Sequence, residues 1–335
     1  MMRRRRLAVV LGVAALLLAD LVPSGISSAQ VRDGHFRVGV MGSQPLAKVL
    51  TGNIAPVVDE LQKLGYVEGK NIKFEVRSSE GETDRFSDIA AEFVALNLDV
   101  ILAANTPAII ALKKTGTSIP IVFTMIGSDP VRLGIVESIP RPGGNFTGII
   151  SNNLEIAAKR MQMLKEIVPD ATRIGMFLNP LNPASQLAVD ETTRQAGPLG
   201  IEIIPIEVKR AEDIAPAIDR ALQVQAQALI TTDDLVTFAN RQTVIELTRQ
   251  KKLPTMYNYR IQALEGGLVS YGVDADAQFR RAAAYIDRIL RGSKPADLPV
   301  EQASRLLLVI NLKTAEAIGV EIPPMLVARA EEVID

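Results

Sequence analysis

The chain has 335 residues, of which 47% are apolar and 22% charged, enough for two hydrophobic cores of ordinary size. Its formal net charge is −1, and because no basic patch stands out, nucleic acid is not expected as a partner. Cysteine is absent and histidine occurs once, at His35, which excludes disulfides and zinc sites made of cysteine and histidine.

The first 29 residues have the layout of a secretory signal peptide. Arg3 to Arg6 form a positive segment, Leu7 to Leu18 is mostly apolar, and Ser27-Ser28-Ala29 is a small-x-small cleavage site. Asp20 and Pro23 shorten the apolar stretch below what a membrane span needs. We therefore expect removal of residues 1–29 and export to the periplasm, by either the general secretion or the twin-arginine route.

The first half of the remaining chain alternates between strand and helix patterns. Apolar residues recur at three- and four-residue steps from Leu46 to Leu64, which predicts a helix that ends at Gly65. Thr106 and Pro107 are typical of the cap and the first turn of another helix. Strands are predicted at Phe36–Met41, Ile72–Val76, Asp99–Ala103, Ile119–Thr124 and Thr147–Ile150.

The second half repeats this order. Helices are predicted at Leu154–Ile167, Asp274–Arg291 and Lys313–Ile318. Strands are predicted at Arg173–Leu178, Glu202–Ile206, Ala228–Thr231, Thr255–Tyr257 and Leu306–Ile310. Strands that alternate with helices indicate an α/β fold with parallel sheets wound on both faces.

The two halves also resemble each other in sequence. Phe36–Met41 returns as Thr172–Phe177, and Ile119–Val122 returns as Leu253–Met256. Two similar α/β lobes in tandem indicate a cleft between them, and such clefts hold ligands.

Polar turns that follow the predicted strands are the candidate ligand-binding positions, because ligands bind beyond the carboxyl ends of parallel strands. The helix start at Thr106, with the hydroxyls of Ser43 and Ser128, can hold a ligand carboxylate. A ligand ammonium can pair with an acidic side chain, for which three candidates remain open: Asp129, Asp233 and Asp234. The tyrosines that can contact an apolar part of the ligand are Tyr257, Tyr259 and Tyr271. The remaining candidates are Gln44, Asn105, Asn179 and Asn182.

No motif of enzyme chemistry stands out. The sequence contains neither a G-x-x-x-x-G-K-[ST] phosphate loop nor a Gly-x-Ser-x-Gly turn. The 38 aspartates and glutamates would allow a two-carboxylate hydrolase, yet no feature selects such a pair. We therefore expect a protein that is not an enzyme and that uses neither a metal ion nor a cofactor.

Several longer motifs resemble one known family. They include Glu60–Ile72, Asn105–Ala108, Ser128–Val131, Arg141–Asn145, Gly266–Gly272, Val309–Ala315 and the end from Ile322 to Ile334. Over the whole mature chain the sequence resembles substrate-binding proteins of ABC transporters, whose few characterised members bind tryptophan or related aromatic amino acids. Two positions depart from the family pattern: Asp234, where relatives usually have proline, and Ile261, where they often carry an acidic residue.

The resemblance implies a type I periplasmic-binding-protein fold, with two flavodoxin-like lobes whose parallel sheets are joined by three crossover segments. It implies a first lobe of residues 30–150 plus about 273–303, and a second lobe of residues 151–272 plus about 304–335.

The function that we expect is a monomeric periplasmic receptor of an ABC importer, which captures an amino acid or a similar small polar ligand and docks on an inner-membrane permease. The alternatives are a periplasmic sensor that presents its ligand to a membrane receptor and, less favoured, an enzyme on the same scaffold.

Overall fold

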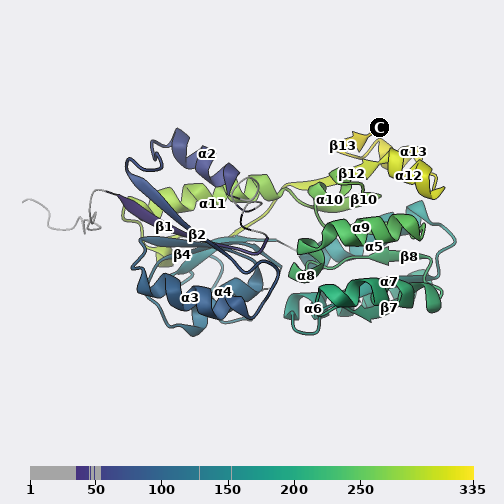
Figure 1. The fold of residues 1–335 in the computed structure, drawn as a ribbon, viewed down its shortest axis with the longest axis horizontal. Coiled ribbons are helices and arrows are strands. Elements are labelled where there is room, and N and C mark those ends of the chain that lie inside the picture. Colours follow the sequence, from purple (N-terminus) through teal and green to yellow (C-terminus); the bar gives the residue numbers. More distant parts are fainter. Residues whose placement is uncertain (1–34, 45, 47–48, 50–53, 128, 152) are drawn as a thin grey trace, which may run out of the picture.

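The computed structural model describes residues 35–44, 46, 49, 54–127, 129–151 and 153–335. The predicted signal peptide of residues 1–29 therefore lies outside the described residues. Figure 1 shows two lobes side by side, each built of a sheet with helices packed on it. Within the described residues, no helix is both long enough and apolar enough to span a membrane.

The first lobe is built on a parallel sheet. Among the described residues its strand order is β11-β5-β4-β3-β1-β2, and each neighbouring pair is parallel. The strands are β1 (Phe36–Gly42), β2 (Ile72–Ser78), β3 (Val100–Ala104), β4 (Ile121–Ile126), β5 (Phe146–Ile150) and β11 (Glu301–Gln302). Its helices are α2 (Ala55–Lys63), α3 (Arg85–Ala95), α4 (Thr106–Lys114) and α11 (Ala275–Leu290).

The second lobe has the same plan with one reversed pair. Its strand order in the described part of the chain is β13-β12-β10-β9-β8-β6-β7, and β10 is antiparallel to β12. The strands are β6 (Arg173–Leu178), β7 (Glu202–Glu207), β8 (Ala228–Ile230), β9 (Thr255–Tyr257), β10 (Val269–Val273), β12 (Leu306–Asn311) and β13 (Glu332–Ile334). The helices are α5 (Asn153–Ile167), α6 (Pro183–Ala196), α7 (Ile214–Gln223), α8 (Leu235–Ala239), α9 (Arg241–Gln250), α10 (Arg260–Leu264), α12 (Leu312–Ile318) and α13 (Pro324–Val327).

The chain passes between the lobes after β5, after β10 and after β11. Figure 1 shows α11, which follows β10, lying on the first lobe rather than on the second. Its buried side chains Phe279 and Ile286 share one apolar cluster with Val38 and Leu61. Each lobe is therefore assembled from segments that are far apart in sequence.

Both faces of the first sheet are buried. Along β1, Val38 and Val40 belong to the cluster beneath α2 and α11, whereas Met41 belongs to the cluster beneath α3 and α4. Successive side chains of a strand point to opposite faces. A strand that is covered on both faces is therefore apolar, which is why the central strands β3 and β4 appear in the sequence as nearly unbroken apolar runs, whereas the edge strand β2 carries Lys73, Glu75 and Arg77.

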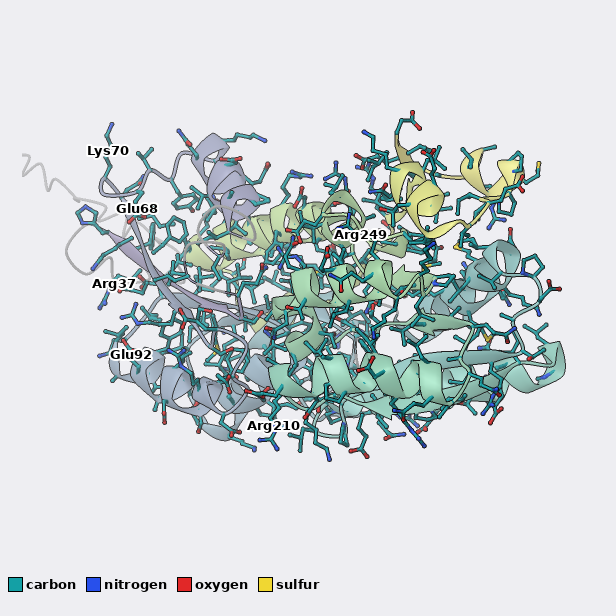
Figure 2. The ribbon with its side chains drawn as sticks, turned by 45° about the vertical axis from the view of Figure 1, so that its right-hand side comes forward. Arg37, Glu68, Lys70, Glu92, Arg210 and Arg249 are labelled. Carbon is teal, nitrogen blue, oxygen red and sulfur yellow. The ribbon has the colours of Figure 1, made fainter. Side chains whose placement is uncertain are left out.

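The orientation of the first sheet places its carboxyl ends near the second lobe. Figure 2 shows Arg37, Glu68 and Lys70 at the end of the first lobe that is remote from the second. Arg37 lies at the start of β1, and Glu68 and Lys70 precede β2. The opposite ends of these strands consequently point toward the second lobe, where a parallel sheet binds its ligands.

The structure confirms the α/β architecture with two mainly parallel sheets and corrects several details. Tyr271, which was expected in a turn after a strand, lies inside β10. The sheets are mainly parallel, as expected, and β10 with β12 is an antiparallel pair that the sequence did not indicate. Of the helix expected from Leu46 to Leu64, the structure describes the part from Ala55 to Lys63 as α2. Most residues between 45 and 53 lie outside the described residues. The short strands β11 and β13 were not predicted, because Glu301 and Glu332 interrupt any apolar run there.

Candidate functional site

A cavity of about 430 Å³ is lined by residues of both lobes. From the first lobe it takes residues at or just beyond the carboxyl ends of β1, β3 and β4: Ser43, Gln44, Ala104, Asn105, Thr106, Pro107 and Met125. From the second lobe it takes Asn182, Ala184, Asp233, Asp234, Leu235, Phe238, Arg241, Tyr259, Arg260, Ile261 and Glu265. The segments near the crossings add Val273, Asp274, Ala275, Asp276, Phe279 and Leu307.

Asn105 brings a hydrogen-bond donor to the first-lobe wall. It is the N-cap of α4, because its side-chain oxygen accepts a hydrogen bond of 2.9 Å from the backbone N–H of Ala108. The predicted cap, Thr106, is instead the first residue of the helix. Asn105 has a φ of 105°, a costly conformation for a residue other than glycine. Its side-chain Nδ2 is buried and has no partner in the described structure, so it is free to donate to a ligand.

Asp234 organises the loops on the second-lobe wall. Its carboxylate accepts hydrogen bonds of 3.0 Å from the side-chain amides of Asn179 and Asn182, and one of 2.9 Å from the backbone N–H of Val236. Only 4% of the residue is exposed, and this burial raises the pKa of the carboxyl group, which the hydrogen bonds partly counteract. Asp234 thus joins the loop after β6 to the start of α8.

Asp233 is held differently. The hydroxyl of Tyr259 donates a hydrogen bond to its Oδ1. The pKa of that hydroxyl lies well above its usual value, first because of burial and then because of the negative charge of Asp233. The positive charge of the buried Arg160, on α5, opposes this rise in the pKa of Tyr259. Asp233 therefore presents an oriented acceptor to the cavity.

Aromatic rings line the cavity beside Asp233. The rings of Phe238 and Tyr259 meet edge to face, with centroids 5.0 Å apart and an angle of 69° between their planes. Phe279 of α11 adds a third ring to the lining, and Met125 contributes a flexible apolar side chain. Such a surface favours a flat apolar group of a ligand.

The two lobes touch across the cavity. Arg241 donates hydrogen bonds of 2.7 and 2.8 Å to Glu265, and its third nitrogen donates one of 3.2 Å to Gln44 of the first lobe. The same guanidinium lies 5.1 Å from the ring centroid of Phe238. Leu235 of α8 packs in an apolar cluster of the first lobe. The described conformation is therefore one in which the lobes are in contact around the cavity.

The structure brings most of the predicted site residues together. Around the cavity lie Ser43, Gln44, Asn105, Thr106, Asn182, Asp233, Asp234 and Tyr259. Asn179 lies behind the wall, bonded to Asp234. Ser128 lies outside the described residues.

The structure places three other predicted residues elsewhere. Tyr257 is 1% exposed, and its hydroxyl is 2.8 Å from the hydroxyl of Thr248. Tyr271 lies in β10 with its side chain in the second-lobe core. Asp129 is exposed and accepts a hydrogen bond of 2.9 Å from the backbone N–H of Val131, which makes it a turn residue.

Sequence reasoning missed Phe238, Arg241 and Phe279. Phe238 could have been identified from the sequence, because it lies one helical turn after the cap residue Asp234. Arg241 and Phe279 gave no local signal, since their places depend on how the lobes meet. Among the described residues, no group of three or more His, Cys, Asp or Glu side chains is arranged to hold a metal ion.

Comparisons with known proteins agree on one family. Residues 48–334 match the family model described as ABC transporter substrate binding protein. The chain is 26% identical over 264 residues to a tyrosine-binding protein of Clostridioides difficile (strain R20291), an alignment that covers 79% of this chain and 75% of that protein.

Solved structures share the fold. An ABC domain from Streptococcus pneumoniae, crystallised in complex with L-Trp, is 25% identical with a TM-score of 0.81, covering 90% of this chain and 100% of that one. A conserved domain protein from Vibrio cholerae is 28% identical with a TM-score of 0.81, covering 89% of this chain and 99% of that one.

Proposed function

The chain belongs to the ABC transporter substrate-binding protein family, and from this premise we propose that it captures an aromatic amino acid between its lobes for an ABC importer. The family consists of binding proteins rather than enzymes. The single observation that carries the choice of ligand is the composition of the cavity. One lobe offers an unpartnered amide donor, and the other offers a carboxylate beside two aromatic rings.

The carboxylate of the ligand lies against the first lobe in this proposal. The buried Nδ2 of Asn105 lacks a partner, and a ligand oxygen would remove the penalty of leaving it unpaired. Thr106, which is 4% exposed, begins α4, where the helix dipole favours negative charge. The hydroxyl of Ser43 lines the same cavity.

The ammonium of the ligand lies against Asp233. A carboxylate is the natural partner of an ammonium group, and Tyr259 fixes one oxygen of Asp233 with a hydrogen bond. Asp234 is less suited to this role because three hydrogen bonds to its own loops already engage it.

The aromatic side chain of the ligand lies on Phe238, Tyr259 and Phe279. The cavity volume of about 430 Å³ falls in the range of ordinary small-ligand pockets, about 300–1,000 Å³. The tyrosine-binding relative and the relative crystallised with L-Trp support an aromatic ligand.

Titration calorimetry with L-tryptophan, L-tyrosine and L-phenylalanine tests this proposal. Tryptamine, which lacks the carboxylate, and indole-3-propionate, which lacks the ammonium, should each bind at least tenfold more weakly than L-tryptophan, because each leaves a buried polar group unpaired. Asp233→Asn should weaken binding, whereas Asp219→Asn, an exposed residue of the same lobe that pairs with Lys251, should not. The proposal fails if none of the three amino acids binds, or if both variants bind like the wild type.

The cellular role is part of the proposal. The signal-peptide pattern of residues 1–29 supports periplasmic location, and the family supports delivery to an ABC permease. N-terminal sequencing of protein recovered from the periplasm should give Gln30 as the first residue. Recovery of the full-length chain from the cytoplasm would contradict this part.

A further inference from the structure

We propose that Gln278 is a positioning residue for the ligand cavity, because it holds a bulge of β4 that directs the side chain of Met125 into the cavity. Met125 lines the cavity, whereas Gln278, on α11, is not among the described lining residues and acts through Met125. The inference rests on the proposed function, since the ligand that Met125 would contact is the proposed aromatic amino acid.

One extra residue interrupts the pairing of β4 with β5. Phe123 pairs with Gly148 and Ile126 pairs with Ile150, so two residues of β4 lie opposite one residue of β5. This is the arrangement of a β-bulge. Met125, one of the two residues, has a φ of 56°, which is costly for a residue other than glycine. Such a conformation persists only where the surrounding structure holds it.

The bulge changes the face of the sheet on which Met125 lies. Ile121 and Phe123 belong to the cluster beneath α3 and α4, and regular alternation would send Met125 to the same face. Instead, Met125 packs against the cluster beneath α2 and α11 and against the core of the second lobe. Ile126 then returns to the cluster beneath α3 and α4. The bulge therefore places Met125 at the junction of the lobes, where it lines the cavity.

Gln278 holds the bulge from α11. Its Oε1 accepts a hydrogen bond of 3.3 Å from the backbone N–H of Met125 and one of 3.1 Å from the hydroxyl of Thr124. Its Nε2 donates a hydrogen bond of 3.1 Å to the hydroxyl of Ser151, which follows β5. A bulge leaves its extra residue without a partner in the ladder, and an N–H group without an acceptor inside the protein is costly. Gln278, which is 3% exposed, supplies the acceptor that the neighbouring strand does not.

Met125 suits the aromatic part of the proposed ligand. Its thioether makes favourable contacts with aromatic rings, and its unbranched side chain adapts to their shape. Phe279, next to Gln278 on α11, lines the same cavity and belongs to the cluster against which Met125 packs. The position of Met125 should therefore affect the contacts of the ligand ring and leave those of its carboxylate and ammonium in place.

A double-mutant cycle of L-tryptophan affinity, measured by calorimetry, tests the positioning role. Met125→Gly should weaken binding roughly threefold to tenfold through loss of the thioether contact. Gln278→Met keeps a side chain of similar volume without the acceptor and should weaken binding by a similar factor. The double variant should bind like Met125→Gly, to within about twofold, because Gln278 acts only through the side chain of Met125.

Thr147→Val is the matched control for loss of a buried hydrogen bond in the same lobe. The hydroxyl of Thr147, on β5, donates a hydrogen bond of 2.7 Å to the backbone oxygen of Leu298, and the residue lies outside the described lining of the cavity. This variant should melt at a lower temperature and bind L-tryptophan like the wild type. If the loss of affinity in the double variant equals the product of the two single losses, Gln278 does not act through Met125 and the inference is overturned.

Melting of the ligand-free protein tests the same contact without a ligand. Glycine adopts a positive φ without steric cost and alanine does not, so Met125→Gly should melt above Met125→Ala, the reverse of the order in a regular strand. In the Gln278→Met background this advantage of glycine should shrink, because the backbone is no longer held at a positive φ. The inference is wrong if alanine melts higher, or if the advantage is equal in both backgrounds. Failure of L-tryptophan, L-tyrosine and L-phenylalanine to bind would refute the choice of ligand, and the melting order would then decide the inference.

Discussion

Asp234→Ala should destabilise the ligand-free protein by about 3 kcal/mol. The substitution removes the acceptor of three hydrogen bonds, from the side chains of Asn179 and Asn182 and from the backbone of Val236. Asn182 lines the cavity, where water can replace the lost acceptor. Asn179 and Val236 are 5% exposed, and each buried donor left unpaired costs about 1–3 kcal/mol.

The matched control is Asp129→Ala. Asp129 also accepts a backbone hydrogen bond, from Val131, but it is exposed, so water can satisfy the donor that remains. We expect a loss of less than about 1 kcal/mol. Urea unfolding followed by circular dichroism, with wild type and both variants in the same buffer, measures the difference. If Asp234→Ala loses no more stability than Asp129→Ala, the view that Asp234 organises the loops of the cavity is refuted.

Three further predictions concern alkali, packing and the ligand. The pKa of each of the five tyrosines is raised in the folded protein, with burial as the largest cause. The contribution of these tyrosines to the free energy of unfolding should therefore be fully present below their unfolded pKa of about 10 and should be lost as the pH rises above it. Tyrosinate absorbance should appear together with unfolding. A native protein that titrates its tyrosines near pH 10 would contradict this. Gly272→Ala should cost about 2–3 kcal/mol, because its Cβ would lie 1.9 Å from the backbone oxygen of Asn258. Gly144→Ala, where no atom lies within 4 Å, should melt like the wild type, and equal melting of the two would count against the described packing. Thr106→Val should weaken L-tryptophan binding by about fivefold to tenfold in calorimetry through loss of one hydrogen bond, and Asp129→Ala should leave it unchanged. Weaker binding by Asp129→Ala would mean that Asp129 contributes to the binding site after all.

The order of strands and helices was predictable because its signals are local. The boundaries of β6 and β9 agree with those expected from their apolar runs. A parallel strand buried on both faces must be apolar along its length. Glu301 and Glu332 interrupt any apolar run in β11 and β13, which are fixed by pairing with β5 and β12.

The candidate site was predictable only where residues directly follow a strand. Ser43, Asn105 and Asp233 come after β1, β3 and β8, and they lie around one cavity. Tyr257 and Tyr271 do not line that cavity because they lie within strands. Successive side chains of a strand point to opposite faces of the sheet, and these two point into the core. The sequence shows a tyrosine but not which face of the sheet it occupies.

The sequence by itself determined the α/β class, the duplicated plan and the polar turns at the strand ends, because these depend on neighbours a few residues away. Only the tertiary structure decided that Arg241 reaches Gln44 and that Leu235 packs into an apolar cluster of the first lobe. These contacts join residues far apart in the chain, and they exist because the chain crosses between the lobes and packs both sheets around one cavity. No local sequence pattern predicts such a contact, because it depends on how whole helices and strands pack in three dimensions.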